Sequence, residues 1–186
     1  PEPMAVDGKP PLVQDQLNIV REIVDHVDAG WQARMGADAR WKGEDENPFS
    51  QYTAEHTRFA FAVLGPAGSG KTSVIDEAID QVNNKGGRIL ITAPTGKLAS
   101  RFREKYPDLE VDTVHGAFAL WKPIQHTADL MLPYDLVIVE ELGQLSQAHF
   151  ERILKLWFNA DRLPTLVFVG DFWQLPGVEP TRALDS

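Results

Sequence analysis

The sequence predicts an α/β fold in which a mainly parallel β-sheet is covered by helices on both faces. Two observations predict it: short apolar runs alternate with segments of helical periodicity, and every polar motif comes directly after such a run. The alternation implies right-handed crossovers between parallel strands. Because such sheets bind ligands at the carboxyl ends of their strands, we expect the polar motifs to share one functional edge.

The N-terminal third of the chain is less regular than the rest. Residues 1–11 are rich in proline, which predicts an irregular lead-in. Apolar residues recur at helical spacing over 12–27, so we expect an amphipathic helix there. Residues 30–57 mix charges, glycines and aromatic residues without a clear period, and predict a surface insertion or long loop. The aromatic side chains of that segment either form a stacking surface for bases or pin the loop to the core.

Regular alternation begins at residue 59. Apolar runs predict four buried strands, at 59–64, 88–92, 136–139 and 165–169. Helical spacing of apolar residues predicts three helices, at 72–82, 96–105 and 147–158. Between them we expect a short strand at 109–111 and a helical turn near 115–120.

Composition bounds the class of protein. With 186 residues the chain is the size of a single domain, which we place over 1–186. Its 43% hydrophobic and 24% charged residues are ordinary for a soluble globular protein, and no apolar run approaches the roughly 20 residues that span a bilayer. The absence of cysteine excludes disulfides and thiolate metal sites and fits an intracellular protein, in the nucleus, mitochondrion or cytoplasm. The formal charge of −9 disfavours a broad phosphate-binding face but leaves room for a narrow nucleic-acid groove.

The most informative motif is GPAGSGKT at residues 65–72, which fits the pattern G-x-x-x-x-G-K-[ST]. It stands between a predicted strand and a predicted helix, where backbone N–H groups and the helix N-terminus bind phosphate. Lys71 would reach the β- and γ-phosphates and Thr72 would place its hydroxyl on Mg²⁺, so the chain is expected to bind ATP or GTP. The competing interpretation is a glycine-rich turn with a surface lysine. The expected nucleotide-contacting residues are Gly65, Pro66, Ala67, Gly68, Ser69, Gly70, Lys71, Thr72 and Ser73.

Acidic and amide side chains follow two of the predicted strands. Glu140 and Glu141 come directly after the run LVIV. One carboxylate at that position can hold Mg²⁺ through water and the next can orient or deprotonate the attacking water, so we assign Glu140 to the metal and Glu141 to the water. The alternative is that the pair caps the next helix. Gln174, in the segment GDFWQLP, would contact the γ-phosphate or the attacking water, unless that segment is a tight turn with buried aromatic residues.

Two further segments have the composition of anion sites. Residues 92–97 (TAPTGK) combine small residues with a helix start, and residues 113–116 (TVHG) offer a hydroxyl, an imidazole and a glycine. A hydroxyl at a helix start is also an ordinary helix cap. Phosphate contact and helix capping therefore both remain open for these residues.

Taken in order, these segments resemble a known family, the superfamily 1 helicases of the RecD-like, PIF-type group. The resemblance rests on six segments of the sequence: LVQDQ (12–16), GPAGSGKT (65–72), TAPTGKLA (92–99), TVHGAF (113–118), LVIVEELGQLS (136–146) and GDFWQLPGV (170–178). It implies a RecA-like P-loop NTPase lobe. It covers nearly the whole chain apart from 30–57, which then reads as an insertion.

The resemblance also implies roles for individual residues. Gln16 would read the adenine edge and favour ATP, and Lys71, Thr72, Glu140, Glu141 and Gln174 would form an ATPase site with ATP and Mg²⁺ as cofactors. Single-stranded DNA would be contacted mostly through its backbone by Pro94, Thr95, Gly96, Lys97 and His115. Members of the family move 5′ to 3′ along one strand by closing two RecA-like lobes around ATP, in processes such as DNA repair and recombination.

The sequence departs from the family pattern in two ways. Glu140 stands where an Asp is usual, which alters the reach toward Mg²⁺ by one methylene. The 186 residues include only the first lobe, without the arginine finger of the second. Because such an arginine contributes roughly 10³–10⁵ in rate, we expect this chain to bind ATP, to hydrolyse it slowly and not to unwind DNA. Two other functions stay open: a stand-alone P-loop ATPase or switch, which the net acidity favours, and a non-hydrolysing nucleotide-dependent interaction module, which Glu140 favours.

Overall fold

A five-stranded parallel sheet forms the centre of the molecule. The structure is a computed structural model that describes residues 11–41, 60–66, 68–159 and 163–171. The strand order is β1-β5-β4-β2-β3, and all paired strands run in the same direction. The strands are β1 (Ala60–Leu64), β2 (Ile89–Ala93), β3 (Glu110–Thr113), β4 (Leu136–Val139) and β5 (Thr165–Gly170). The predicted α/β fold with a parallel sheet is confirmed, and each expected strand is present within one or two residues of its predicted bounds.

The three inner strands are buried on both faces. Every residue of β2, β4 and β5 is buried. Alternate residues of each strand belong to different hydrophobic clusters: Ile89 and Ile91 of β2 face one cluster, and Leu90 faces the other. Continuous apolar runs are typical of strands covered on both sides, which is why these runs showed no polar alternation.

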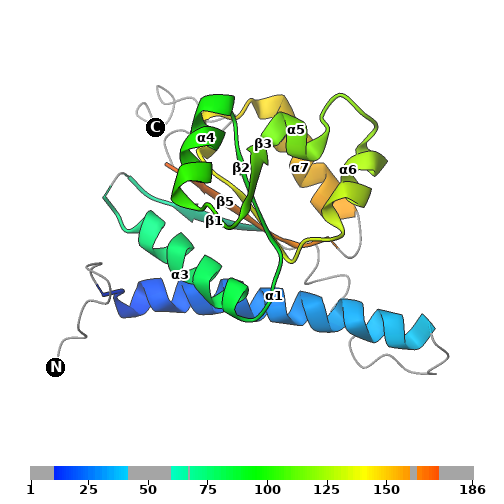
Figure 1. The fold of residues 1–186 in the computed structure, drawn as a ribbon, viewed down its shortest axis with the longest axis horizontal. Coiled ribbons are helices and arrows are strands. Elements are labelled where there is room, and N and C mark those ends of the chain that lie inside the picture. The colour runs from blue at the N-terminus through cyan, green and yellow to red at the C-terminus, as the bar shows by residue number, and fades with distance from the viewer. Residues whose placement is uncertain (1–10, 42–59, 67, 160–162, 172–186) are drawn as a thin grey trace, which may run out of the picture.

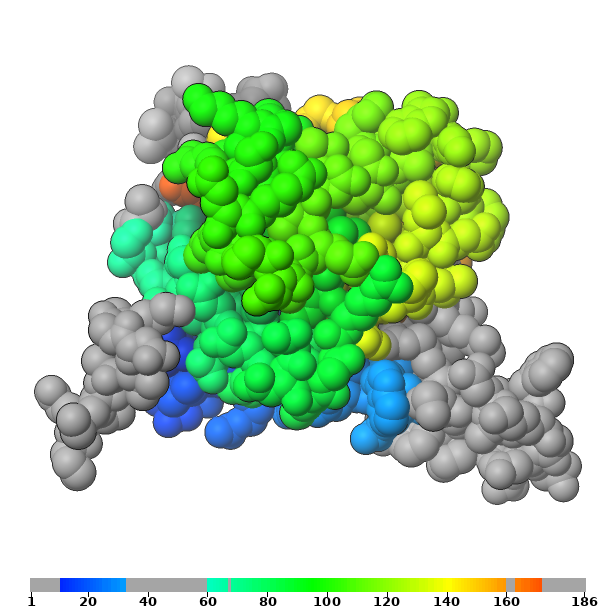
Figure 2. Space-filling view, in the orientation of Figure 1, coloured from blue at the N-terminus to red at the C-terminus, as the bar shows by residue number. Residues whose placement is uncertain are grey.

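Helices cover both faces of the sheet (Figure 1). On one face α1 (Gln14–Trp41) packs against α3 (Lys71–Asn84), and side chains such as Ile23 and Ile75 bury against the sheet. Figure 2 shows the side chains of α3 lying against α1. The other face is covered by α5 (Val114–Phe118), α6 (Ile124–Met131) and α7 (Gln147–Asn159), with Trp157 at the centre of their cluster. The remaining helix, α4 (Gly96–Lys105), packs against β2 and β3.

The predicted loop over 30–57 is wrong for its first part, because α1 continues without a break to Trp41. In the sequence, apolar residues recur at helical spacing only as far as Val27, so periodicity could not reveal the extension. The residues beyond include four alanines and two arginines, which favour a helix by intrinsic propensity, whereas Gly30 and Gly36 oppose it. Residues 42–57, and with them most of the predicted aromatic surface, lie outside the described residues. So do residues 1–10 of the predicted lead-in.

Two short elements have no counterpart among the predictions. α6 (Ile124–Met131) buries only Thr127, Ala128 and Met131, and a 3₁₀ turn, η1, covers Leu142–Gln144. Both are too short for periodicity to define them. The other helices match their predicted ranges closely: α4 has the expected bounds, and α3, α5 and α7 differ by one or two residues at their ends. Within the described ranges, no helix is both long and apolar enough to cross a membrane.

Candidate functional site

The carboxyl ends of the strands meet at one edge of the sheet. The strand register places Leu64 of β1 level with Gly170 of β5. Backbone hydrogen bonds continue past the strands: the Gly65 N–H donates to the Gly170 carbonyl (3.1 Å), and the Glu140 N–H donates to the Thr92 carbonyl (2.8 Å). The segments that follow β1, β2, β4 and β5 are therefore held together, as the parallel fold predicted.

The loop after β1 forms a tight cradle at the start of α3. Gly68 and Gly70 have φ values of 81° and 89°, a region that glycine enters without steric cost. The Ser69 N–H donates to the Pro66 carbonyl (3.1 Å), which closes the turn. No side chain caps the start of α3, so its first N–H groups are left to bind an anion. Ala67 lies outside the described residues.

A cavity of about 280 Å³ opens in front of this loop. Lys71 and Thr72 line it from the loop, Glu140 and Glu141 from the end of β4, and Asp171 from the end of β5. The structure thus brings together four of the five residues expected to form an ATPase site. The fifth, Gln174, lies outside the described residues.

Glu140 is the buried acid of this cavity, with only 8% of its surface exposed. Burial raises the pKa of Glu140 to about 7; the cation of Lys105 opposes this shift, and the carboxylates of Glu141 and Asp76 add to it. The surrounding protein supplies too little positive charge to offset the burial of the ionised Glu140 carboxylate, and a bound cation would supply that charge.

Glu141 has a left-handed backbone, with φ 52° and ψ 51°. This conformation costs a non-glycine residue about 1–2 kcal/mol, and such residues concentrate at functional sites. Glu141 precedes the 3₁₀ turn Leu142–Gln144, but its side chain makes no capping hydrogen bond there. The alternative that the acidic pair merely caps the next helix therefore finds no support at Glu141.

Gln16 lies directly against the phosphate loop. A Cβ atom added at Gly70 would come within 2.1 Å of the Gln16 side-chain nitrogen Nε2. The side-chain oxygen of Gln16 accepts a hydrogen bond from the Val13 N–H (3.0 Å), which fixes the amide at the start of α1. Two residues 54 positions apart in the sequence are thus neighbours, and a side chain at Gly70 would displace the Gln16 amide in addition to straining the backbone at its positive φ.

Three residues of the site had no signal in the sequence. Lys105 and Tyr106 line the cavity from the end of α4, and both interact with Asp76 on α3. The Lys105 Nζ lies 3.3 Å from an Asp76 carboxylate oxygen, and the Tyr106 hydroxyl donates to the same oxygen. Burial, followed by the hydrogen bond to Asp76, raises the pKa of Tyr106. A lysine in the last turn of a helix is an ordinary C-terminal residue, so only the packing of α4 against the sheet reveals this contact.

The segments predicted to contact DNA begin α4 and α5, at the upper edge of the molecule in Figure 1. Thr95 caps α4 by accepting a hydrogen bond from the Leu98 N–H (3.2 Å), and Thr113 caps α5 by accepting one from Gly116 (3.0 Å). Both hydroxyls therefore act as helix caps, and contact of these segments with phosphate stays a prediction. Capping uses only the two threonine hydroxyls, so it does not exclude DNA contact by the other predicted residues. Four of the five predicted residues are exposed (Thr95, Gly96, Lys97 and His115), and Pro94 is partly exposed.

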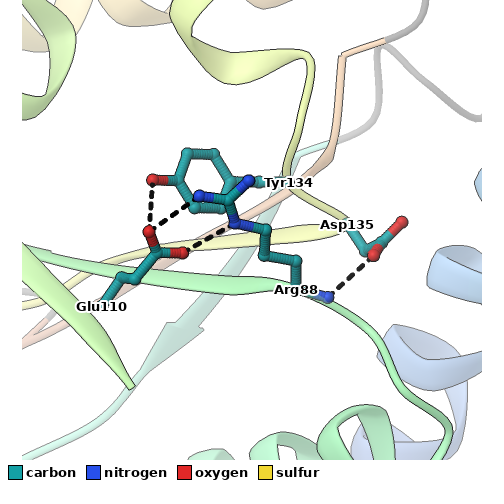
Figure 3. Close-up of polar contacts among 4 residues, drawn as sticks. All are labelled: Arg88, Glu110, Tyr134 and Asp135. Atoms are coloured by element: carbon teal, nitrogen blue, oxygen red, sulfur yellow. Dashed lines mark hydrogen bonds and ion pairs between the residues drawn. The ribbon is translucent and has the colours of Figure 1, made fainter. Parts of the chain in front are cut away.

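A second polar cluster lies at the opposite edge, where strands β2, β3 and β4 begin (Figure 3). Arg88 donates two hydrogen bonds of 2.9 Å to Glu110, and its backbone N–H donates to Asp135 (2.8 Å). The Tyr134 hydroxyl donates to Glu110 (3.3 Å), and the Arg88 guanidinium lies over the Tyr134 ring. The hydrogen bond from Arg88 holds the pKa of Glu110 below its usual value. The cluster joins three strands at the amino edge and takes no part in the cavity.

A model of the AAA domain family matches residues 47–186. The chain belongs to this family. The match covers the phosphate loop, the acidic pair and both predicted DNA-contact segments.

Comparison with individual proteins gives a consistent result. Mouse DNA helicase B is 31% identical over 108 residues, a match that covers 55% of this chain and 10% of the helicase. The Pif1 helicase of Candida albicans superposes with a TM-score of 0.54 at 16% identity, over 94% of this chain and 35% of that one. A Bacteroides Pif1 in complex with ADP-AlF4 gives 0.51 at 19% identity, over 95% and 36%.

These likenesses confirm the predicted α/β P-loop fold of a RecA-like lobe, and they agree with the resemblance to PIF-type helicases. The chain spans about a third of the length of the Pif1 structures it matches and a tenth of the mouse helicase.

Proposed function

We propose that this AAA-family chain is the ATP-binding motor lobe of an ATP-dependent DNA helicase that moves 5′ to 3′ on single-stranded DNA. The observation that carries the proposal is the 280 Å³ cavity, in which Lys71, Thr72, Glu140 and Glu141 meet from segments about 70 residues apart. A lysine and a hydroxyl on a glycine-rich loop, opposite two carboxylates, are the groups that phosphoryl transfer from Mg-ATP requires.

In this proposal Mg²⁺ would be bound jointly by side chains of the protein and by the phosphates of the nucleotide. The described residues hold no cluster of three or more His, Cys, Asp or Glu side chains that would bind a metal alone. Mg²⁺ commonly takes one or two protein oxygens and completes its shell with water and phosphate, which matches Thr72 and Glu140. The ion would neutralise charge on the β- and γ-phosphate oxygens. Glu141 would orient the attacking water, and its left-handed backbone supports a site held under strain.

The nucleotide would bind along the phosphate loop, with its adenine toward the start of α1. Residues 65–73 would hold the phosphates through backbone N–H groups, with Lys71 on the terminal phosphates. Gln16 would read the adenine edge, which its contact with Gly70 supports. Gln174 would complete the site from the segment after β5.

Single-stranded DNA would cross the starts of α4 and α5. Exposure of Thr95, Gly96, Lys97 and His115 supports this path, together with the order of β2 and β3 as neighbours. The likeness to Pif1 helicases, one of them studied for DNA unwinding at forked dsDNA, supports a motor on DNA (TM-score 0.53, 19% identity, 95% of this chain and 37% of that one). The polarity and any role in repair or recombination rest on the family resemblance.

Calorimetric titration with ATP and Mg²⁺ tests the nucleotide site. Lys71→Ala should weaken binding roughly 10- to 100-fold, because it removes a charge-assisted hydrogen bond to phosphate. Lys85→Ala is the matched control, since Lys85 follows the other end of the same helix and pairs with Asp28 at the surface. Wild-type protein that releases no heat with Mg-ATP, or equal affinity in the two variants, would contradict the site.

Fluorescence anisotropy with labelled single strands at low salt tests the DNA path, because phosphate contacts are strongest there. His115→Ala and Lys97→Ala should each weaken binding. If Mg-ATP binds and single strands do not, the stand-alone ATPase or switch becomes the better function. We expect slow hydrolysis and no strand displacement from these 186 residues.

A further inference from the structure

Three aromatic rings meet beside the predicted DNA path. His115 belongs to α5, Trp121 follows α5, and His149 belongs to the first turn of α7. The centroid of the His115 ring is 5.0 Å from that of Trp121 and 6.4 Å from that of His149. These separations lie within the 4.5–7 Å range of interacting aromatic rings. We call these three residues the aromatic platform.

The backbone conformation around Trp121 keeps its side chain at the surface. Ala119, at the end of α5, has a left-handed conformation with φ 48°, which turns the chain back over the helix. The Leu120 N–H donates to the His115 carbonyl (3.3 Å), and the Lys122 N–H donates to the Ala119 carbonyl (2.9 Å). Leu120 is buried, whereas 61% of Trp121 is exposed. The turn is anchored by its neighbours, so the indole ring contributes little to the core and remains available to a ligand.

Basic groups adjoin the platform. Lys122 is exposed directly after Trp121, and the Arg152 guanidinium on α7 donates to the Lys122 carbonyl. The nearby acid on α7, Glu151, accepts a hydrogen bond from Gln147 (2.9 Å). Stacked bases with a phosphate backbone are the ligand that such a surface fits.

We propose that the aromatic platform stacks one or two bases of single-stranded DNA, with Trp121 as the principal ring. The proposal rests on the DNA path of the proposed function and adds base contacts to the backbone contacts expected there. His115 links the two, because it lies in the first turn of α5 on that path and its ring contacts Trp121. Bases in a duplex have their faces covered by neighbouring base pairs, so the platform takes single strands.

Two oligonucleotides separate base stacking from phosphate binding: an oligothymidylate, and an abasic deoxyribose-phosphate oligomer of equal length. Fluorescence anisotropy at low salt should show that Trp121→Ala weakens oligothymidylate binding about 5- to 100-fold, the usual effect of removing one stacked ring. Binding of the abasic oligomer should change little, and Trp121→Phe should keep most of the affinity. Trp31→Ala is the control, since Trp31 is also exposed (52%) but lies on α1.

Each other outcome is decisive. If wild type binds oligothymidylate and Trp121→Ala binds it equally well, the platform is overturned while the DNA path stands. An equal loss for both oligonucleotides would also overturn stacking, and unchanged far-UV circular dichroism and melting temperature would exclude misfolding as its cause. Wild type that binds neither oligonucleotide would refute the DNA path itself, and the platform with it.

Discussion

Replacing Gly70 by alanine should destabilise the protein more than the same change at Gly68, although both glycines have a positive φ. At Gly68 an added Cβ meets no described atom within 4 Å, so the cost is backbone strain alone, about 1–2 kcal/mol. At Gly70 the same strain applies, and the Cβ would lie 2.1 Å from the Gln16 Nε2. The amide must move and its exposed hydrogen bond from Val13 is weakened or lost, which adds at most about 1 kcal/mol.

Urea denaturation followed by far-UV circular dichroism measures these free energies of unfolding. We expect Gly70→Ala to cost about 2–3 kcal/mol and Gly68→Ala about 1–2 kcal/mol. In a Gln16→Ala background the two glycine substitutions should cost the same, because the amide is gone. The double-mutant cycle between Gln16 and Gly70 should therefore give about 1 kcal/mol of coupling, and the cycle between Gln16 and Gly68 none. Zero coupling at Gly70 would refute the reasoning that the Gln16 amide restricts the side chain at this position.

Two further predictions concern the cavity. Because of Glu140, the free energy of unfolding of the wild type should fall by about 2–3 kcal/mol between pH 5 and pH 8. The Glu140→Gln variant should lack this fall. The folded pKa of about 7 exceeds the ordinary 4.5, so the folded state binds more protons and loses stability as pH rises through this window. Denaturation without added magnesium measures it, with exposed Glu104→Gln as control; parallel profiles for wild type and Glu140→Gln would be inconsistent with a raised pKa. Tyr106→Phe should lower the free energy of unfolding by about 1–3 kcal/mol, because it removes the hydrogen bond to Asp76. Thermal unfolding measures this change, and equal stability of variant and wild type would argue against that hydrogen bond.

Much of the fold could be predicted from local patterns in the sequence. Continuous apolar runs predicted β2, β4 and β5 because a strand covered on both faces needs apolar residues at every position. The phosphate loop was accessible for a similar reason, since its glycines and the following helix are adjacent in sequence. The helical segment 30–41 was missed because its sequence contains two glycines and presents no regular apolar face.

Only part of the site could be predicted from the sequence. Lys71, Thr72, Glu140 and Glu141 were predicted by motif and strand position, and the structure brings them to one cavity. Nothing near Lys105 or Tyr106 in the sequence indicates that they face the same cavity, because their partner Asp76 belongs to a helix some thirty residues earlier.

By itself, the sequence determined the order of elements, the parallel sheet and the phosphate loop, because each depends on residues within a few positions of one another. Only the tertiary structure decided the strand order β1-β5-β4-β2-β3, the contact of Gln16 with Gly70 and the meeting of Trp121 with His115 and His149. These depend on which strands pair and how helices pack across them. Long-range burial of apolar surface sets that pairing, and no local spacing encodes it.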